Sequence, residues 1–124
     1  MKTIFLAEGE KHVREALRLM LEHQFDFVIA GEASTAESTL AKVCQHPADV
    51  ILLDWNLPGL HPQRLLAALL QCCPDMLILA TSVRPEQENV ALQFGANGFL
   101  LKQLSPDQFI SALISAVHQR EGSK

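Results

Sequence analysis

The sequence predicts a doubly wound α/β domain, in which helices cover both faces of a five-stranded parallel sheet with strand order 2-1-3-4-5. Short, continuous apolar segments alternate with longer segments of helical spacing along the whole chain. Brief runs of Val, Ile, Leu and Phe are typical of strands that are buried on both faces of a parallel sheet. The strand–helix unit recurs five times, and right-handed crossovers between such units favour this strand order.

Five segments have the pattern of buried strands. They are 3–7 (TIFLA), 27–31 (FVIAG), 49–54 (DVILLD), 76–81 (MLILAT) and 98–102 (GFLLK). The segments between them carry apolar residues on one helical face, because Val13, Leu17 and Leu21 fall at i, i+4 and i+8. Equivalent helical stripes lie at 36–43, 65–70, 90–94 and 109–117.

Proline, serine and glycine mark the expected helix boundaries. Pro62 and Pro85 suit first helical turns, where the missing proline N–H costs no hydrogen bond. Ser105 followed by Pro106 is the pattern of an N-cap and a first helical residue. Gly95 suits the end of the helix that precedes it.

Bulk properties narrow the class of protein. A length of 124 residues is sufficient for one domain, which we expect to occupy residues 1–124. The net charge of -4 argues against direct contact with nucleic acid, which requires a cationic face. No apolar run approaches the roughly 20 residues needed to span a bilayer, so we expect no contact with the membrane.

The cysteines and histidines suggest neither a disulfide nor a zinc site. Cys44, Cys72 and Cys73 are odd in number, include an adjacent pair and lack CxxC spacing. This pattern predicts no disulfide and favours a reducing cytoplasm as the location. The five histidines lack the spacing with which a helix presents zinc ligands.

Polar residues stand at the carboxyl ends of four predicted strands. They are Glu8 after the first, Asp54 on the third, Thr81 with Ser82 on the fourth and Lys102 on the fifth. Ligands of open parallel sheets bind outside these carboxyl ends, where the strand order reverses. We therefore expect two acids, a hydroxyl and an amine to converge in one crevice.

These chemical types complement one another. Carboxylates bind hard cations such as Mg²⁺, and a carboxylate can also attack phosphorus to give an aspartyl phosphate. A hydroxyl and an ammonium then stabilise the phosphoryl oxygens. An ammonium about 4 Å from a phosphate charge gains about 4 kcal/mol at an effective dielectric constant of about 20, which is enough to hold a loop in a new position.

Three motifs occur in order around these residues: VILLDWNLPG at 50–59, LILATS at 77–82 and GANGFLLK at 95–102. Together they resemble the receiver domains of bacterial response regulators, which are signalling modules with a flavodoxin-like fold. VREALRLMLE at 13–22 and GEA at 31–33 are similar to receivers that precede a helix-turn-helix output domain. The resemblance covers essentially the whole chain.

The resemblance implies a role for the residues of the crevice. Asp54 would be the phosphoacceptor, and Thr81 and Lys102 would be the catalytic residues that contact the phosphoryl group. Thr81 and Phe99 would form the switch that reports phosphorylation.

The resemblance also implies partners for the chain. The phosphoryl group would come from a sensor histidine kinase or a phosphotransfer protein. A second copy of the chain and a C-terminal DNA-binding output domain outside this chain are further expected partners. We expect a signalling module rather than an enzyme.

The metal site departs from the receiver pattern. By resemblance, Mg²⁺ would be held by Glu8, Asp54 and the backbone carbonyl of Asn56. Gly9 stands where receivers carry a second acid that is normally a direct ligand. We therefore expect weak Mg²⁺ binding unless Glu8 or Glu10 replaces the missing acid.

Two further departures lie close to the crevice. Gln103 stands where a proline usually follows the lysine, and His61-Pro62 replaces the common Asp-Gly of the loop after Asp54. We expect His61 to be a solvated loop residue. We expect Trp55 to cover the pocket at the surface.

Three other kinds of protein share part of this pattern, and only the first of them remains an alternative. The missing acid at Gly9 motivates a pseudo-receiver that binds its partner constitutively and is never phosphorylated. A phosphatase with an aspartate nucleophile carries DxD on its first strand, whereas this chain has DxN at 54–56 on the third. A flavin or nucleotide domain needs an uncharged turn after the first strand, whereas AEGEKH at 7–12 places negative charge there.

Overall fold

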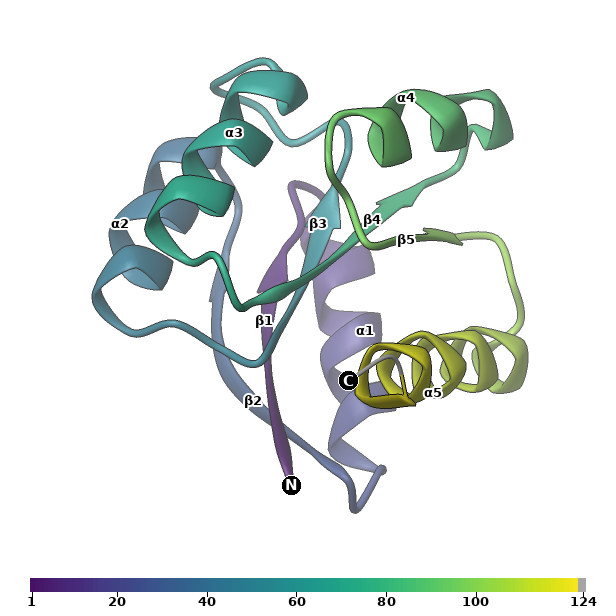
Figure 1. Ribbon diagram of the computed structural model, residues 1–124. Helices are drawn as coiled ribbons and strands as arrows, with labels where there is room; N and C mark the ends of the chain where they lie inside the picture. The colour runs from purple at the N-terminus through teal and green to yellow at the C-terminus, as the bar shows by residue number, and fades with distance from the viewer. Residues whose placement is uncertain (123–124) are drawn as a thin grey trace.

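The structure is a computed structural model that describes residues 1–122. Its five parallel strands form one sheet in the order β2-β1-β3-β4-β5 (Figure 1). The strands are β1 (Lys2–Ala7), β2 (Phe27–Ala33), β3 (Val50–Asp54), β4 (Leu77–Ser82) and β5 (Gly98–Leu101). The helices are α1 (Lys11–Glu22), α2 (Ala36–Gln45), α3 (Pro62–Cys72), α4 (Glu88–Gln93) and α5 (Pro106–Gly122), with a 3₁₀ turn η1 (Pro85–Gln87) before α4. The predicted fold class and strand order are confirmed.

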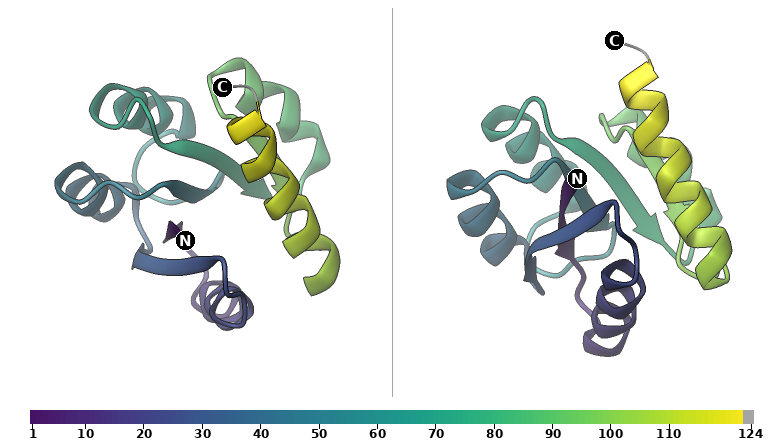
Figure 2. Two further views of the ribbon diagram at one scale, coloured as in Figure 1. Left: turned by 60° about the horizontal axis from the view of Figure 1, so that its bottom comes forward. Right: turned by 90° about the horizontal axis from the view of Figure 1, so that it is seen from below.

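The sheet separates two hydrophobic layers. Ile51 and Leu53 of β3 point into the layer under α2, α3 and α4, whereas Val50 and Leu52 point into the layer under α1 and α5. Figure 2 shows α1 and α5 on one side of the sheet and α2 and α3 on the other. Every residue of β3 and β4 is buried, which explains why their apolar runs are continuous rather than alternating.

The predicted boundary signals lie at helix ends. Pro62 begins α3, and Pro85 begins η1. The backbone N–H of Gln108 donates to the Oγ of Ser105 at 3.3 Å, which caps the start of α5. Gly95 follows α4 with a φ of +116°, a left-handed conformation that favours glycine.

No helix within residues 1–122 is long and apolar enough to cross a membrane.

A disulfide joins Cys44, in the last turn of α2, to Cys72, the last residue of α3. Cys73 is a free, buried thiol. The prediction that the cysteines form no disulfide is therefore wrong for this pair. It failed because α2 and α3 lie side by side on one face of the sheet (Figure 1), so packing brings together two helix ends that are 28 residues apart in sequence.

Candidate functional site

Three charged side chains meet at the carboxyl edge of the sheet. Glu8 directly follows β1, Asp54 ends β3 and Lys102 directly follows β5. The Nζ of Lys102 lies 2.8 Å from Oε1 of Glu8 and 3.0 Å from Oδ1 of Asp54. The fold thus brings the two acids and the amine into one ion triad, as we refer to Glu8, Asp54 and Lys102 below.

The ion triad is withdrawn from solvent. The side chains of Glu8, Asp54 and Lys102 are 2%, 6% and 14% exposed. A buried charge without a partner is costly, so each carboxylate depends on the shared ammonium for compensation.

Burial and ion pairing shift the pKa values of Glu8 and Lys102 in opposite directions. Burial raises the pKa of Glu8 above its ordinary value, and the negative charge of Asp54 adds to this, although hydrogen bonds from Lys102 and from the backbone of Glu10 oppose it. Burial lowers the pKa of Lys102, but the hydrogen bond with Glu8 and the charge and hydrogen bond of Asp54 outweigh it and raise the pKa overall. The ammonium is therefore held in its charged form between the two acids.

Backbone N–H groups from two loops fix the carboxylates. The N–H of Gly9 donates to Oδ2 of Asp54 at 3.2 Å, and the N–H of Asn56 donates to Oδ1 at 3.0 Å. The N–H of Glu10 donates to Oε2 of Glu8 at 2.9 Å. The loops after β1 and β3 therefore hold both acids in defined orientations.

Two longer side chains brace the loops around the site. The guanidinium of Arg14 donates to the backbone oxygen of Glu8 at 2.8 Å and lies 3.5 Å from Oε1 of Glu32. The Nε2 of Gln103 donates to the backbone oxygen of Val83 at 3.1 Å. The residue in the usual proline position thus ties the loop after β5 to the loop after β4.

Gly9 lies close to both Pro58 and Asp54. A Cβ at this position would lie 3.0 Å from Cδ of Pro58 and 3.6 Å from Oδ2 of Asp54. No group of three or more His, Cys, Asp or Glu side chains in the described part of the chain is arranged to hold a metal ion. Glu8 and Asp54 supply two carboxylates at this edge of the sheet, and Mg²⁺ is usually bound through one or two carboxylates.

The two residues expected to form a switch lie on neighbouring strands. Thr81 of β4 is paired in register with Asp54 and is buried. Phe99 of β5 is paired in register with Ala80, is half-buried and packs against the hydrophobic layer under α3 and α4. Thr81 thus lies beside the triad, and Phe99 lies one strand away.

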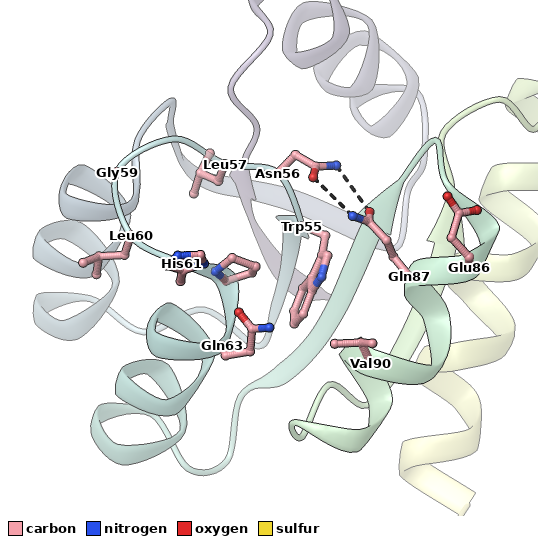
Figure 3. Close-up of a pocket in the computed structure, with 11 residues that line it drawn as sticks. Trp55, Asn56, Leu57, Gly59, Leu60, His61, Gln63, Glu86, Gln87 and Val90 are labelled. Carbon is pink, nitrogen blue, oxygen red and sulfur yellow. Dashed lines mark hydrogen bonds between the residues drawn. The ribbon is translucent and has the colours of Figure 1, made fainter.

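Gln87 links two loops at the mouth of the site, which is formed by the loops after β3 and β4 (Figure 3). Its side-chain amide exchanges two hydrogen bonds of 3.4 Å with that of Asn56. Its Oε1 also accepts a hydrogen bond from Oγ of Ser82, and that Oγ accepts one from the N–H of Arg84 at 2.9 Å. No sequence pattern indicates Gln87, because only the 3₁₀ turn η1 brings it opposite Asn56.

A groove of about 570 Å³ opens beside this link, between the β3–α3 loop and the start of α4 (Figure 3). Its lining includes Trp55, His61 and Val90. The indole of Trp55 is only 3% exposed and packs in the hydrophobic layer, so the prediction that it covers the pocket at the surface is wrong. His61 is exposed, as predicted for a loop residue.

A family comparison agrees with this geometry. The sequence profile of the response regulator receiver domain matches residues 4–114. The chain belongs to this family. The identification made from the three motifs is confirmed: the domain is a receiver of two-component signalling.

Curated relatives of this receiver domain are considerably longer than the chain. The nitrate/nitrite response regulator protein NarL of Escherichia coli strain K12 is 32% identical over 116 residues, which are 92% of this chain and 54% of NarL. The transcriptional regulatory protein DegU of Brevibacillus brevis is 28% identical over 112 residues, which are 89% of this chain and 48% of DegU. The chain spans about half the length of these relatives.

Solved structures of receiver domains have the same fold. The signal receiver domain of a NarL response regulator from Mycobacterium tuberculosis has a TM-score of 0.83 at 27% identity, over 92% of this chain and 94% of that domain. A CheY-like receiver domain from Methanospirillum hungatei JF-1 has a TM-score of 0.85 at 20% identity, over 100% and 99% of the two chains. The second likeness concerns the fold alone.

Proposed function

We propose that residues 1–124 form a phosphorylation-dependent receiver domain in which Asp54 accepts a phosphoryl group from a histidine kinase or a phosphotransfer protein. The observation that carries this proposal is the ion triad, in which the Asp54 carboxylate and the Lys102 ammonium are 3.0 Å apart at the carboxyl edge of the sheet. A carboxylate that is already oriented by backbone N–H groups is well placed to act as a nucleophile.

In the proposed reaction, a carboxylate oxygen of Asp54 attacks the phosphorus of a phosphohistidine. The new O–P bond forms as the N–P bond of the donor breaks, and the donor imidazole leaves with the electron pair of that bond. The product is an acyl phosphate on Asp54. The Lys102 ammonium compensates the added negative charge, and the Thr81 hydroxyl donates to a phosphoryl oxygen.

Mg²⁺, when bound by Glu8, Asp54 and the carbonyl of Asn56, would neutralise phosphoryl charge during transfer. We propose that the ion binds weakly, because Gly9 supplies no carboxylate. The same absence reduces repulsion among the acids, so Lys102 alone suffices to compensate Glu8 and Asp54 before phosphorylation.

A change of partners at Lys102 would connect the site to the rest of the domain. The ammonium now contacts both Glu8 and Asp54, whereas a phosphoryl group on Asp54 would compete for it. We propose that the Thr81 side chain turns towards the phosphoryl group and that the Phe99 ring moves into the space which Thr81 vacates. This is a shift between two populations, driven by contacts that differ between them.

The length difference from the relatives supports a larger assembly. Because the chain spans about half of NarL and DegU, we propose that it acts with a C-terminal DNA-binding output domain, in the cytoplasm, and pairs with a second copy of itself. In this proposal the domain is a signalling module and not an enzyme, and it contacts nucleic acid only through the output domain.

Incubation with acetyl phosphate and Mg²⁺, followed by intact-mass measurement, tests the proposal. The wild type should gain one phosphoryl group, and Asp54→Asn should gain none. Asp26→Asn is a matched control, because it removes an exposed aspartate that directly precedes β2, at the opposite edge of the sheet from the triad, and should be phosphorylated like the wild type. An adduct that persists in Asp54→Asn would contradict the assignment of the phosphoacceptor, and an unmodified wild type would favour a constitutive binding module.

A further inference from the structure

We propose that Cys44 and Cys72 form a thiol–disulfide exchange site, a reversible covalent link between α2 and α3. The two Cα atoms are 5.8 Å apart, within the range of roughly 4.4–6.8 Å over which disulfides form. Each cysteine lies in the last turn of its own helix, so the link joins the ends of α2 and α3. The proposal is independent of phosphorylation at Asp54.

The position of the link indicates exchange rather than a purely structural role. Both Cys44 and Cys72 are exposed, so small thiols and disulfides reach the sulfur atoms. Exposed disulfides are reduced more readily than buried ones and are typically the labile or regulatory ones. The two hydrophobic layers that flank the sheet already provide a full core, so the fold does not depend on a covalent staple.

Cys73 differs from the linked pair in its burial, which bears on the pKa of its thiol. Its side chain is 4% exposed, and its Sγ donates to the backbone oxygen of Val43 at 3.7 Å. Burial raises the pKa of the Cys73 thiol, which keeps it protonated. Since the thiolate is the nucleophile, Cys73 should be inert although its Sγ lies 3.4 Å from that of Cys72.

A low-molecular-weight disulfide such as oxidised glutathione is the chemical class of oxidant. The thiolate of Cys44 or Cys72 attacks one sulfur of this disulfide, which gives a mixed disulfide and releases one small thiol. The second cysteine thiolate then attacks the protein sulfur of the mixed disulfide and releases the second small thiol. Two electrons leave the protein with the two small thiols, and excess reduced thiol reverses both steps.

The link encloses a functionally important part of the chain. The two cysteines are 28 residues apart, and the enclosed segment contains β3, Asp54 and nearly all of α3. Closing a loop of this length restricts the unfolded chain, so the oxidised form should melt roughly 10 °C above the reduced form. The redox state would thereby set the stability of the α2–α3 half of the domain.

Equilibration of the reduced protein with defined mixtures of reduced and oxidised glutathione provides the test. After acid quenching, denaturation and alkylation, intact mass should show that two thiols are lost together. Cys73→Ala should retain this behaviour. Cys44→Ser and Cys72→Ser should instead retain a mixed disulfide with glutathione on the remaining exposed cysteine, and Asp54→Asn should behave like the wild type.

Several results would overturn the proposal. These are a wild type that forms no internal link at any glutathione ratio, a link that survives in Cys44→Ser, or a link that excess reduced glutathione does not open. Equal melting temperatures of the oxidised and reduced proteins would refute the stabilising effect of the link.

Discussion

Replacing Lys102 with Met removes the ammonium that compensates two buried carboxylates while it retains most of the apolar stem. Removing one partner of a buried ion pair costs about 3–5 kcal/mol, because the remaining charge is left uncompensated. The triad side chains are 2%, 6% and 14% exposed, so solvent screening reduces this cost only slightly. We therefore expect Lys102→Met to lower the free energy of unfolding by about 3 kcal/mol or more, out of the roughly 5–15 kcal/mol typical of a domain.

A second substitution should recover part of this loss. In Lys102→Met, Glu8 and Asp54 face one another without a cation between them, so Glu8→Gln in that background removes one of two repelling charges. In the wild-type background, the same Glu8→Gln change removes a carboxylate that Lys102 compensates. The two substitutions should therefore be non-additive by about 1–3 kcal/mol, as expected for residues in one charged network.

Urea unfolding in EDTA at neutral pH measures these differences. Trp55 is the only tryptophan and is buried beside the site, so its fluorescence reports unfolding in all variants. Lys11→Met is the matched control. The Lys11 side chain is 72% exposed and its ion pair with Glu15 is long, at 4.0 Å, so this substitution should lower the free energy of unfolding only slightly. A Lys102→Met protein as stable as the wild type, or strictly additive effects with Glu8→Gln, would show that the triad is not one electrostatic unit.

Further predictions concern the metal, the mouth of the site and the switch. Gly9→Asp should tighten Mg²⁺ binding about tenfold to a hundredfold in calorimetry, whereas Gly9→Asn, with similar bulk but no charge, should not; equal affinities of Gly9→Asp and the wild type would show that the existing acids suffice. Gln87→Ala should admit water and speed loss of the phosphoryl group several-fold, followed by intact mass over time; a lifetime like that of the neighbouring control Glu86→Ala would contradict a role for the link. A phosphoryl mimic such as beryllofluoride should shift the amide resonances of residues 82–104, which include Phe99, and unchanged shifts would refute the switch.

The triad could be predicted from the sequence because its position depends on few details of packing. Apolar runs identify the strands, and the carboxyl ends of parallel strands meet at one edge whatever the helices do. Glu8 and Asp54 end up adjacent because β1 and β3 are neighbours, whereas Lys102 follows β5 and its long side chain reaches both acids past β4. The boundary residues Pro62 and Gly95 were equally predictable, because backbone conformation alone restricts them.

The remaining features depend on tertiary geometry that no local pattern contains. The Cys44–Cys72 link requires the ends of α2 and α3 to be adjacent, which follows from the packing of both helices on the sheet. Gln87 meets Asn56 only because a 3₁₀ turn precedes α4. Trp55 is buried because its strand end turns the indole into the hydrophobic layer, and a strand end alone does not indicate which way a side chain points.

Chemical location of the acyl phosphate tests the central proposal most directly. After incubation with acetyl phosphate and Mg²⁺, borohydride reduces an aspartyl phosphate to homoserine, and peptide mass analysis identifies the residue that has changed. We predict homoserine at position 54 of the treated wild type, within the segment VILLDWNLPG, and none without the phosphodonor. Reduction at any other residue, or an unchanged Asp54 peptide from a protein that carries a phosphoryl group, would contradict the account.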